Sequence, residues 1–553
     1  MELLKKVHHL ILVFILALAF TTHLSSQALP DSILGHPVQK DAAGRLLPWF
    51  EPNIPGAGYV HVTRLASEFI KNAPLYEPLD LKMYFVTCCF HADENREIIA
   101  EDWMHNPACI WAGLVQGLVL DYRVYSGDES YIDIVREMLD YQLKHGTTPE
   151  EWKWPNVPYA SADPFVREYE GAGRWEHDGM RGDGLHGIEP DKLGELGFAY
   201  LMFYQVTEEK RFLQAAVQCA DVLAQYVRDV RPESRDFIAA DVQRSPWPFR
   251  VNARTGVVLS EYCSNVIEPI KLLDELVRIG DRIDLTAAQD SSYRAARKIA
   301  WDWLFSINGP IKTGIWNAYF EDIPNDPDRS NRIQITPMET ARYLINHPES
   351  VQGIEMYVPA LIHWVASAFA TDGFDAIKEQ TWCYLPMGSH TSRYASVCAR
   401  WYERTGDSWY KEQARRFFNY ATYMCATDGV VSVGHSWPSC WWSDGYSDYI
   451  KHFMAGIAAI PEWVPAGENH LLKSTSIVQT IQYDQNSISY RTFDDASIEV
   501  IRAKSKPRFI KIGNETIEQR TKLDKQGWTW RALETGGVLK IRHETRNHII
   551  SKF

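Results

Sequence analysis

A helix–turn–helix unit recurs in this sequence and limits the folds that the chain can adopt. One copy reads Tyr-Arg-Val-Tyr-Ser-Gly-Asp at residues 122–128, and another reads Trp-Tyr-Glu-Arg-Thr-Gly-Asp at residues 401–407. In both copies, tyrosines follow the aspartate at the same two offsets, as Tyr131 and Tyr141 and as Tyr410 and Tyr420. Glycine ends the first helix because it adopts the left-handed conformation, and aspartate caps the second helix. Such repeats predict an array of stacked helix hairpins.

The connections between the helix pairs favour a closed array over an open one. Apolar residues recur at three- and four-residue spacing over residues 57–468, and tight turns join the helices within each clear pair. The long connections between pairs are 145–192, 229–260, 308–355, 371–391 and 427–445. In an up-and-down arrangement they all lie on one face, where long ordered loops carry function. We predict an (α/α)6 barrel of six helix hairpins, with an open superhelix as the alternative.

The two ends of the chain differ in pattern from this helical region. Lys5 and Lys6 precede a short apolar run at residues 10–20, which is typical of a cleaved secretory signal and predicts a secreted or periplasmic protein. After residue 470, apolar and polar residues alternate, which predicts a small antiparallel β domain packed as a sandwich against the barrel. We expect a signal at 1–26, an extended lead-in at 27–56, the barrel at 57–468 and the β domain at 469–553.

Charge and motifs exclude several kinds of function. The formal charge is −14 and no basic run is present, which argues against nucleic-acid binding. The nine cysteines include no CxxC pair, no His spacing is convincing for a metal, and no P-loop, GxSxG or HExxH occurs. We therefore expect no metal or cofactor, and no membrane span once the signal is removed. Most of the 20 Trp and 27 Tyr residues are explained by helix packing, and a minority by stacking on sugars.

Two loops that precede inner helices concentrate acids, His, Trp and Gly. They cover residues 175–191 and 435–449. Glycoside hydrolysis needs two carboxyl groups across the scissile bond, one to protonate the leaving oxygen and one to attack the sugar or activate water. The candidate catalytic acids are Asp183, Glu189, Asp444 and Asp448. An aspartate just before a helix is also a common N-cap, an interpretation that fits Asp191 and Asp444.

The same loops, together with one inner helix, supply candidate substrate-binding residues. Arginine matches a carboxylate in bidentate fashion, protonated histidine also pairs with one, and tryptophan offers a flat apolar surface to a sugar ring. A uronic acid substrate would need such a clamp for its carboxylate. The candidates are His177, Arg181, His186, Arg393, His435, Trp437, Trp441, Trp442 and Tyr446.

Three segments carry a resemblance to a known family. They are Leu-Lys-Met-Tyr-Phe-Val-Thr-Cys-Cys-Phe at 81–90, Asp-Lys-Leu-Gly-Glu-Leu at 191–196, and residues 441–449. With the overall organisation of helix pairs and β domain, the chain resembles the unsaturated glucuronyl hydrolases and, more specifically, the β-glucuronidases of glycoside hydrolase family 154. The unsaturated glucuronyl hydrolases are shorter and lack the β domain. The resemblance implies a secreted enzyme that removes β-linked glucuronic acid from an oligosaccharide or polysaccharide.

Two other functions stay open at this point. A polysaccharide lyase would neutralise the uronate and use a Tyr or His as base, for which Tyr446, Tyr449, His435 and His186 are candidates. A non-catalytic glycan-binding helical repeat is the second alternative. A lyase leaves an unsaturated sugar that absorbs ultraviolet light, a hydrolase leaves a saturated one, and a binding protein turns over nothing.

Overall fold

The computed structural model describes residues 29–553, apart from 93–94, 96, 101–104, 172–183, 232–243, 318–330, 436–439 and 547. For residues 90–92 and 440–446 it describes the backbone alone. The expected signal at 1–26 therefore lies outside the described residues. In the part of the chain that is described, no helix is both long enough and apolar enough to cross a bilayer.

Six helical segments in the described chain contact one another in a closed circle. Each contacts the next along the sequence, and the last contacts the first again. The first inner segment continues through a π-helical stretch, η3 (Val115–Tyr122), into α4 (Arg123–Ser126). The inner helices are α3 (Pro107–Leu114), α6 (Pro190–Thr207), α8 (Ile267–Arg278), α11 (Ile335–Asn346), α13 (Gly388–Thr405) and α15 (Ser443–Ala459).

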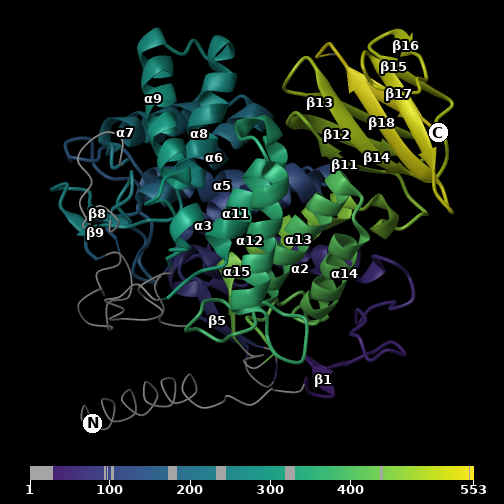
Figure 1. Ribbon diagram of the computed structural model, residues 1–553, viewed down its shortest axis with the longest axis horizontal. Helices are drawn as coiled ribbons and strands as arrows, with labels where there is room; N and C mark the ends of the chain where they lie inside the picture. Colours follow the sequence, from purple (N-terminus) through teal and green to yellow (C-terminus); the bar gives the residue numbers. More distant parts are fainter. Residues whose placement is uncertain are drawn as a thin grey trace.

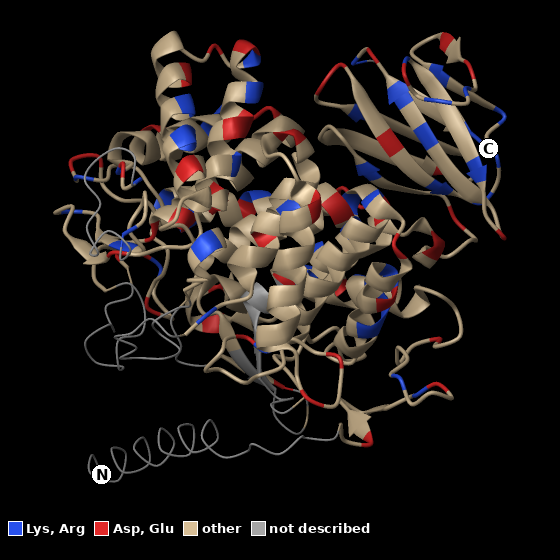
Figure 2. Ribbon diagram, in the orientation of Figure 1, with Lys and Arg blue, Asp and Glu red and all other residues tan. Residues whose placement is uncertain are grey.

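A second set of helices packs on the outside of this circle, each against the inner helices that precede or follow it. Charged residues of both signs are interspersed over the helices of both rings (Figure 2). The mixture agrees with the lack of a basic run in the sequence. The outer helices are α2 (Ala57–Lys71), α5 (Ser130–His145), α7 (Lys210–Tyr226), α9 (Ala287–Phe305), α12 (Ile354–Phe369) and α14 (Ser408–Thr422).

The repeated turns have the expected geometry. Gly127 and Gly406 end their helices with φ of 78° and 74°, in the left-handed region. Asp407 is the N-cap of α14 and accepts a hydrogen bond from the Trp409 N–H. Asp128 lies one residue before the N-cap of α5, yet its carboxylate accepts the Ser130 N–H at 3.0 Å. The prediction of helix pairs joined by Gly-Asp turns is confirmed.

One inner helix was not expected from the sequence. The segment 308–355 is predicted as a connection, but it contains α11. This helix has only 12 residues, and Pro337 and two threonines in its first half weaken the local helical signal. Tertiary packing against α8, α12 and α13 overrides that weak propensity.

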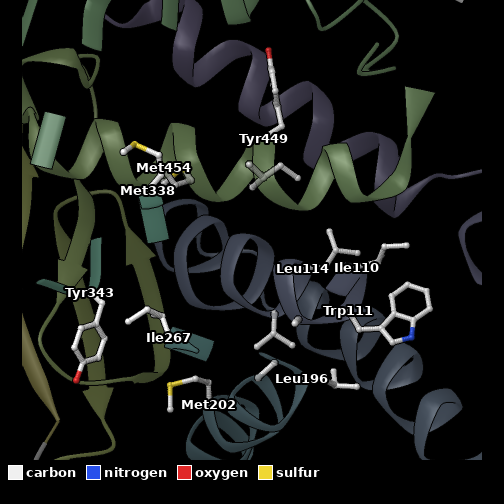
Figure 3. Packing of buried hydrophobic residues seen from close by; sticks show 14 of the residues in the cluster. Ile110, Trp111, Leu114, Leu196, Met202, Ile267, Met338, Tyr343, Tyr449 and Met454 are labelled. Atoms are coloured by element: carbon white, nitrogen blue, oxygen red, sulfur yellow. The ribbon is translucent and has the colours of Figure 1, made fainter. Parts of the chain in front are cut away.

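Apart from charged groups inside the inner ring, the space between the helices is filled by buried apolar side chains. Figure 3 shows Ile110 and Trp111 of α3 near Leu196 of α6, with further side chains from α8, α11 and α15 in the same cluster. Trp111 and Leu196 are fully buried. The aromatic load that the sequence shows is therefore used mainly for helix packing, as predicted.

The chain after α15 forms two antiparallel sheets with one shared core. The first has strand order β11–β14–β18–β17 and the second β12–β13–β19–β15–β16. The predicted small antiparallel β region is confirmed. The strands are β11 (His470–Ser474), β12 (Val478–Asp484), β13 (Ser487–Thr492), β14 (Ser497–Ala503), β15 (Phe509–Ile512), β16 (Glu515–Ile517), β17 (Gly527–Ala532), β18 (Gly537–His543) and β19 (Ile549–Lys552).

This sandwich is fixed to the end of the ring where the short turns lie (Figure 1). The buried Arg123 guanidinium donates to the Val478 carbonyl at 2.5 Å, and the Tyr483 hydroxyl donates to the Val124 carbonyl at 2.6 Å. The His470 ring stacks on Tyr125 with 3.9 Å between ring centroids. The two ends of the ring therefore differ: the sandwich packs at one, and the long connections gather at the other.

Candidate functional site

Charged side chains line the interior of the inner ring near the starts of its helices. Four inner helices carry an oppositely charged pair three residues apart, and burying such groups is costly unless they pair or serve a function. The pairs are Lys192–Glu195 at 3.4 Å, Glu268–Lys271 at 2.7 Å, Glu339–Arg342 at 3.2 Å and Asp448–Lys451 at 3.1 Å. We call these eight residues, together with Arg393, the lumen network.

Arg393 of α13 connects two acids of this network. Its Nε donates to Glu339 Oε1 at 3.2 Å, and its Nη2 donates to Asp448 Oδ2. A third nitrogen, Nη1, lies 3.1 Å from His390 Nδ1. The Arg393 side chain is only 4% exposed. Arg393 was predicted to bind substrate, and in the structure it contacts the carboxylates of Glu339 on α11 and Asp448 on α15.

The cations around Asp448 keep it ionised. Burial alone would raise the pKa of Asp448, but Arg393, Lys451 and His452 lower it well below its ordinary range. For Lys451, burial lowers the pKa, and the carboxylates of Asp448, Glu339 and Glu195 raise it above the usual value. Asp448, a predicted catalytic acid, is therefore a carboxylate with cationic partners on α13 and α15.

Glu195 of α6 has the opposite electrostatic character. Its burial raises the pKa, as does the nearby Glu268, and these effects outweigh Lys192, Lys451 and Lys271, which lower it. The side chain retains 18% exposure, so it is not sealed in the packed core. One lumen thus holds a carboxyl group whose pKa is raised, Glu195, and one whose pKa is lowered, Asp448.

Glu189 lies at the start of the same helix but in a buried ion pair. It is the N-cap residue of α6, and Arg250 Nε on β8 (Arg250–Asn252) donates to its Oε1 at 2.8 Å. The side chains of Glu189 and Arg250 are 4% and 0% exposed. This pair ties β8 to the first turn of α6 and compensates the burial of the Glu189 carboxylate.

The interpretation of Asp191 as the N-cap of α6 is wrong, because Glu189 occupies that position and Pro190 begins the helix. Asp191 instead lies in the buried first turn, where its Oδ2 accepts the Asn265 amide at 3.2 Å. Burial is the main cause of its raised pKa. Asp191 is thus a second carboxyl group with a raised pKa on the α6 side of the ring.

The two predicted histidines that are described pack against aromatic rings. His186, with φ of 63°, lies edge-on to Trp152 with 4.5 Å between ring centroids. His435 Nδ1 lies 2.9 Å from the Tyr420 hydroxyl, and burial lowers the pKa of His435 to about 4. Among the described residues, neither histidine forms a hydrogen bond or ion pair with the lumen network.

Several predicted residues cannot be placed in the site. Asp183, His177, Arg181 and Trp437 lie outside the described residues. For Asp444, Trp441, Trp442 and Tyr446 the backbone alone is described: β10 (Cys440–Trp442) leads into the start of α15.

The backbone of β10 brings together two segments that carry the family resemblance. It pairs antiparallel with β5 (Cys89–Ala92), with Trp441 opposite Phe90. The third segment, residues 191–196, forms the first turns of α6, which supply Asp191, Lys192 and Glu195. The three segments thus lie either at the start of an inner helix, α6 or α15, or in the strands β5 and β10.

The described part of the chain holds neither a cluster of metal-ligand residues nor a disulfide bond. Its His, Cys, Asp and Glu residues form no group of three or more suited to holding a metal ion. The eight cysteines that are described, all except Cys440, form no disulfide, and seven of them are buried. The buried ones pack as small side chains, and Cys383 Sγ also donates to Glu379 Oε2 at 3.1 Å.

Comparison with known proteins gives matches to solved structures alone. No family model matches the chain, and no curated protein matches it. D-mannose isomerase superposes with a TM-score of 0.46 at 10% identity, over 73% of this chain and 96% of the other. An unsaturated glucuronyl hydrolase specific for heparin gives 0.43 at 9%, over 72% and 96%. Cellobiose 2-epimerase from Bacillus thermoamylovorans gives 0.44 at 10%, over 71% and 98%. The function is therefore inferred from the chain's own residues.

Proposed function

We propose that this protein is an (α/α)6-barrel glycoside hydrolase that removes a uronic acid, β-linked glucuronic acid, from a complex glycan. Glu195 is the proposed proton donor, and Asp448 is the proposed base or nucleophile. The observation that carries this proposal is the opposite shift of their pKa values within one lumen. Two carboxyl groups whose environments push their pKa values apart are the hallmark of acid and base roles in glycosidases.

The chemistry uses each group in the protonation state that its surroundings favour. Glu195 donates its proton to the glycosidic oxygen as the bond from that oxygen to the anomeric carbon breaks. Asp448 either attacks the anomeric carbon or takes a proton from the water that does. Arg393 and Lys451 hold Asp448 in its ionised form, and Glu339 holds Arg393 in turn.

The charge of the lumen supports an acidic substrate. The lumen network holds four acids against five cations, and burial raises the pKa of one of these acids, Glu195, which weakens its negative charge further. A uronate carboxylate would supply part of the missing negative charge. The acids are Glu195, Glu268, Glu339 and Asp448, and the cations are Lys192, Lys271, Arg342, Arg393 and Lys451.

The lyase alternative loses one candidate base. Tyr449 is fully buried, and its hydroxyl donates to the Ala421 carbonyl at 2.7 Å. A general base must reach the proton that it removes.

The amino-terminal pattern of residues 5–27 supports the further proposal that the enzyme is exported and meets its oligosaccharide or polysaccharide outside the cytoplasm.

Product identification tests the reaction class. Purified protein is incubated with oligosaccharides that carry terminal glucuronic acid, and products are followed by chromatography and ultraviolet absorbance together. Saturated free glucuronic acid, lost in Asp448→Asn, is expected. An unsaturated product would transfer the assignment to a lyase, and no product from any substrate would refute the hydrolase and favour a binding protein.

A further inference from the structure

A cavity of about 720 Å³ opens at the end of the ring where the β-sandwich packs. Its mouth carries exposed side chains from α8, α9 and the turn after α11: those of Arg278, Arg294 and Glu349 are 47%, 63% and 73% exposed. Leu472 and Lys473 of β11 form part of its wall. This opening lies at the end of the ring opposite the long connections.

Three polar side chains at the floor of this cavity have no hydrogen-bond or ion-pair partner among the described residues. Gln116 and Asp121 on η3, and Arg400 on α13, line the floor, and none forms a hydrogen bond or an ion pair with any residue that the structure describes. Burial lowers the pKa of Arg400 and raises that of Asp121 to about 7. All three side chains are partly exposed within the cavity, so a ligand that displaces water there must supply hydrogen bonds to them.

The other charges of the cavity wall are already paired. Arg297 Nε bonds Asp274 at 3.0 Å, and Lys473 bonds Glu403. Arg342 bonds Glu339 at 3.2 Å. The unpaired donors and acceptor are therefore concentrated at the floor, in the centre of the ring.

The helix that presents two of these groups is itself unusual. Val115–Tyr122 is π-helical, whereas α3 before it and α4 after it are α-helical. π-Helical turns are rare, less favourable than α-helix, and frequent at functional sites. Here the widened turn carries both Gln116 and Asp121 toward the same cavity.

We propose that the floor of this cavity is a carbohydrate subsite, in which Gln116, Asp121 and Arg400 bind the hydroxyl groups of a neutral sugar residue. A hydroxyl both donates and accepts, so one pyranose can donate to Asp121 and accept from Arg400 and Gln116. The half-buried Phe198 ring on the wall offers an apolar surface for the sugar face. A volume of this size is ordinary for a small-molecule site.

The subsite is continuous with the proposed catalytic lumen. Glu339 and Lys451 line the cavity and also belong to the lumen network. The inference rests on the proposed function in one respect: the neutral sugar is taken to be part of the same glycan that carries the uronic acid. Sugar binding itself can be measured without turnover.

The test is binding of neutral methyl glycosides to the full chain. Methyl β-D-glucoside, methyl β-D-galactoside and methyl α-L-rhamnoside are titrated while saturation-transfer NMR and calorimetry are recorded. The variants are Arg400→Met and Gln116→Ala. Arg404→Met is the matched control, because Arg404 lies on the same helix but is exposed. Thermal unfolding of each variant shows whether it folds.

We expect at least one glycoside to bind the wild-type chain and Arg404→Met equally. Loss of a charged hydrogen bond should weaken binding by about tenfold or more in Arg400→Met, and less in Gln116→Ala. The milder Gln116→Ala variant keeps the test valid if Arg400→Met does not fold. Binding of no glycoside, or equal binding by the folded variants, would overturn the subsite. Glycoside binding that persists while no uronide is hydrolysed would instead refute the proposed function and leave the subsite standing.

Discussion

The buried pair of Glu189 and Arg250 gives a quantitative test of how the start of α6 is held. The bond length is 2.8 Å, and both side chains are almost wholly buried. Replacing Arg250 with Met leaves the Glu189 carboxylate buried without this partner, which costs about 3–5 kcal/mol of the free energy of unfolding. The exposed pair of Arg64 and Glu68, at 3.2 Å and with side chains 48% and 47% exposed, is the matched control. Arg64→Met should cost about 0–1 kcal/mol.

The assay is urea unfolding followed by tryptophan fluorescence, with the slope of the transition checked for each variant. The double variant Glu189→Leu/Arg250→Met buries neither charge and should recover much of the loss. If Arg250→Met is no less stable than Arg64→Met, the account of the α6 start is refuted. A double variant that is stable but inactive would show instead that Glu189 takes part in catalysis, as the sequence alone suggested.

Two further predictions concern α6. Glu195 has a raised pKa in the folded state, so its ionised form lowers the free energy of unfolding. This penalty is absent below the ordinary carboxyl pKa, and it grows as the pH rises through the raised pKa of the folded state. Glu195→Gln should therefore be more stable than wild type at about pH 8 and equal to it at about pH 4, as measured by urea unfolding; equal stability at both values would contradict the raised pKa. Gly194→Ala places a Cβ 2.3 Å from the Pro269 backbone nitrogen on α8, whereas Gly467→Ala meets nothing within 4 Å. The first should lower stability by about 1–3 kcal/mol and the second should not, and a harmless Gly194→Ala would contradict the close packing of α6 on α8.

More of the fold than of the candidate site could be predicted from the sequence. Gly127, Gly406 and Asp407 mark their turns through local backbone chemistry, which does not depend on the rest of the chain. The strands after His470 likewise follow from alternation that is visible over a few residues. Helix α11 was missed because its stability comes from neighbours that are distant in sequence.

The lumen network was missed for a related reason. A candidate list drawn from loops favours residues near Gly and Trp, and it contained Asp448 and Arg393 but not Glu195 or Glu339. The network's residues share one sequence pattern: an acidic residue and a Lys or Arg lie three positions apart, and this spacing recurs in four inner helices. On one helix the pattern is an ordinary surface ion pair, and the closed ring is what turns four such pairs toward each other.

The most direct test of the central claim is the rate at which glucuronic acid is released by Glu195→Gln. The control is Glu355→Gln, on the exposed side of the outer helix α12. If Glu195 is the proton donor, its variant should lose about a hundredfold or more in kcat on a substrate with a poor leaving group, whereas Glu355→Gln keeps the wild-type rate. A Glu195→Gln enzyme that releases glucuronic acid within a few-fold of the wild-type rate would contradict the account.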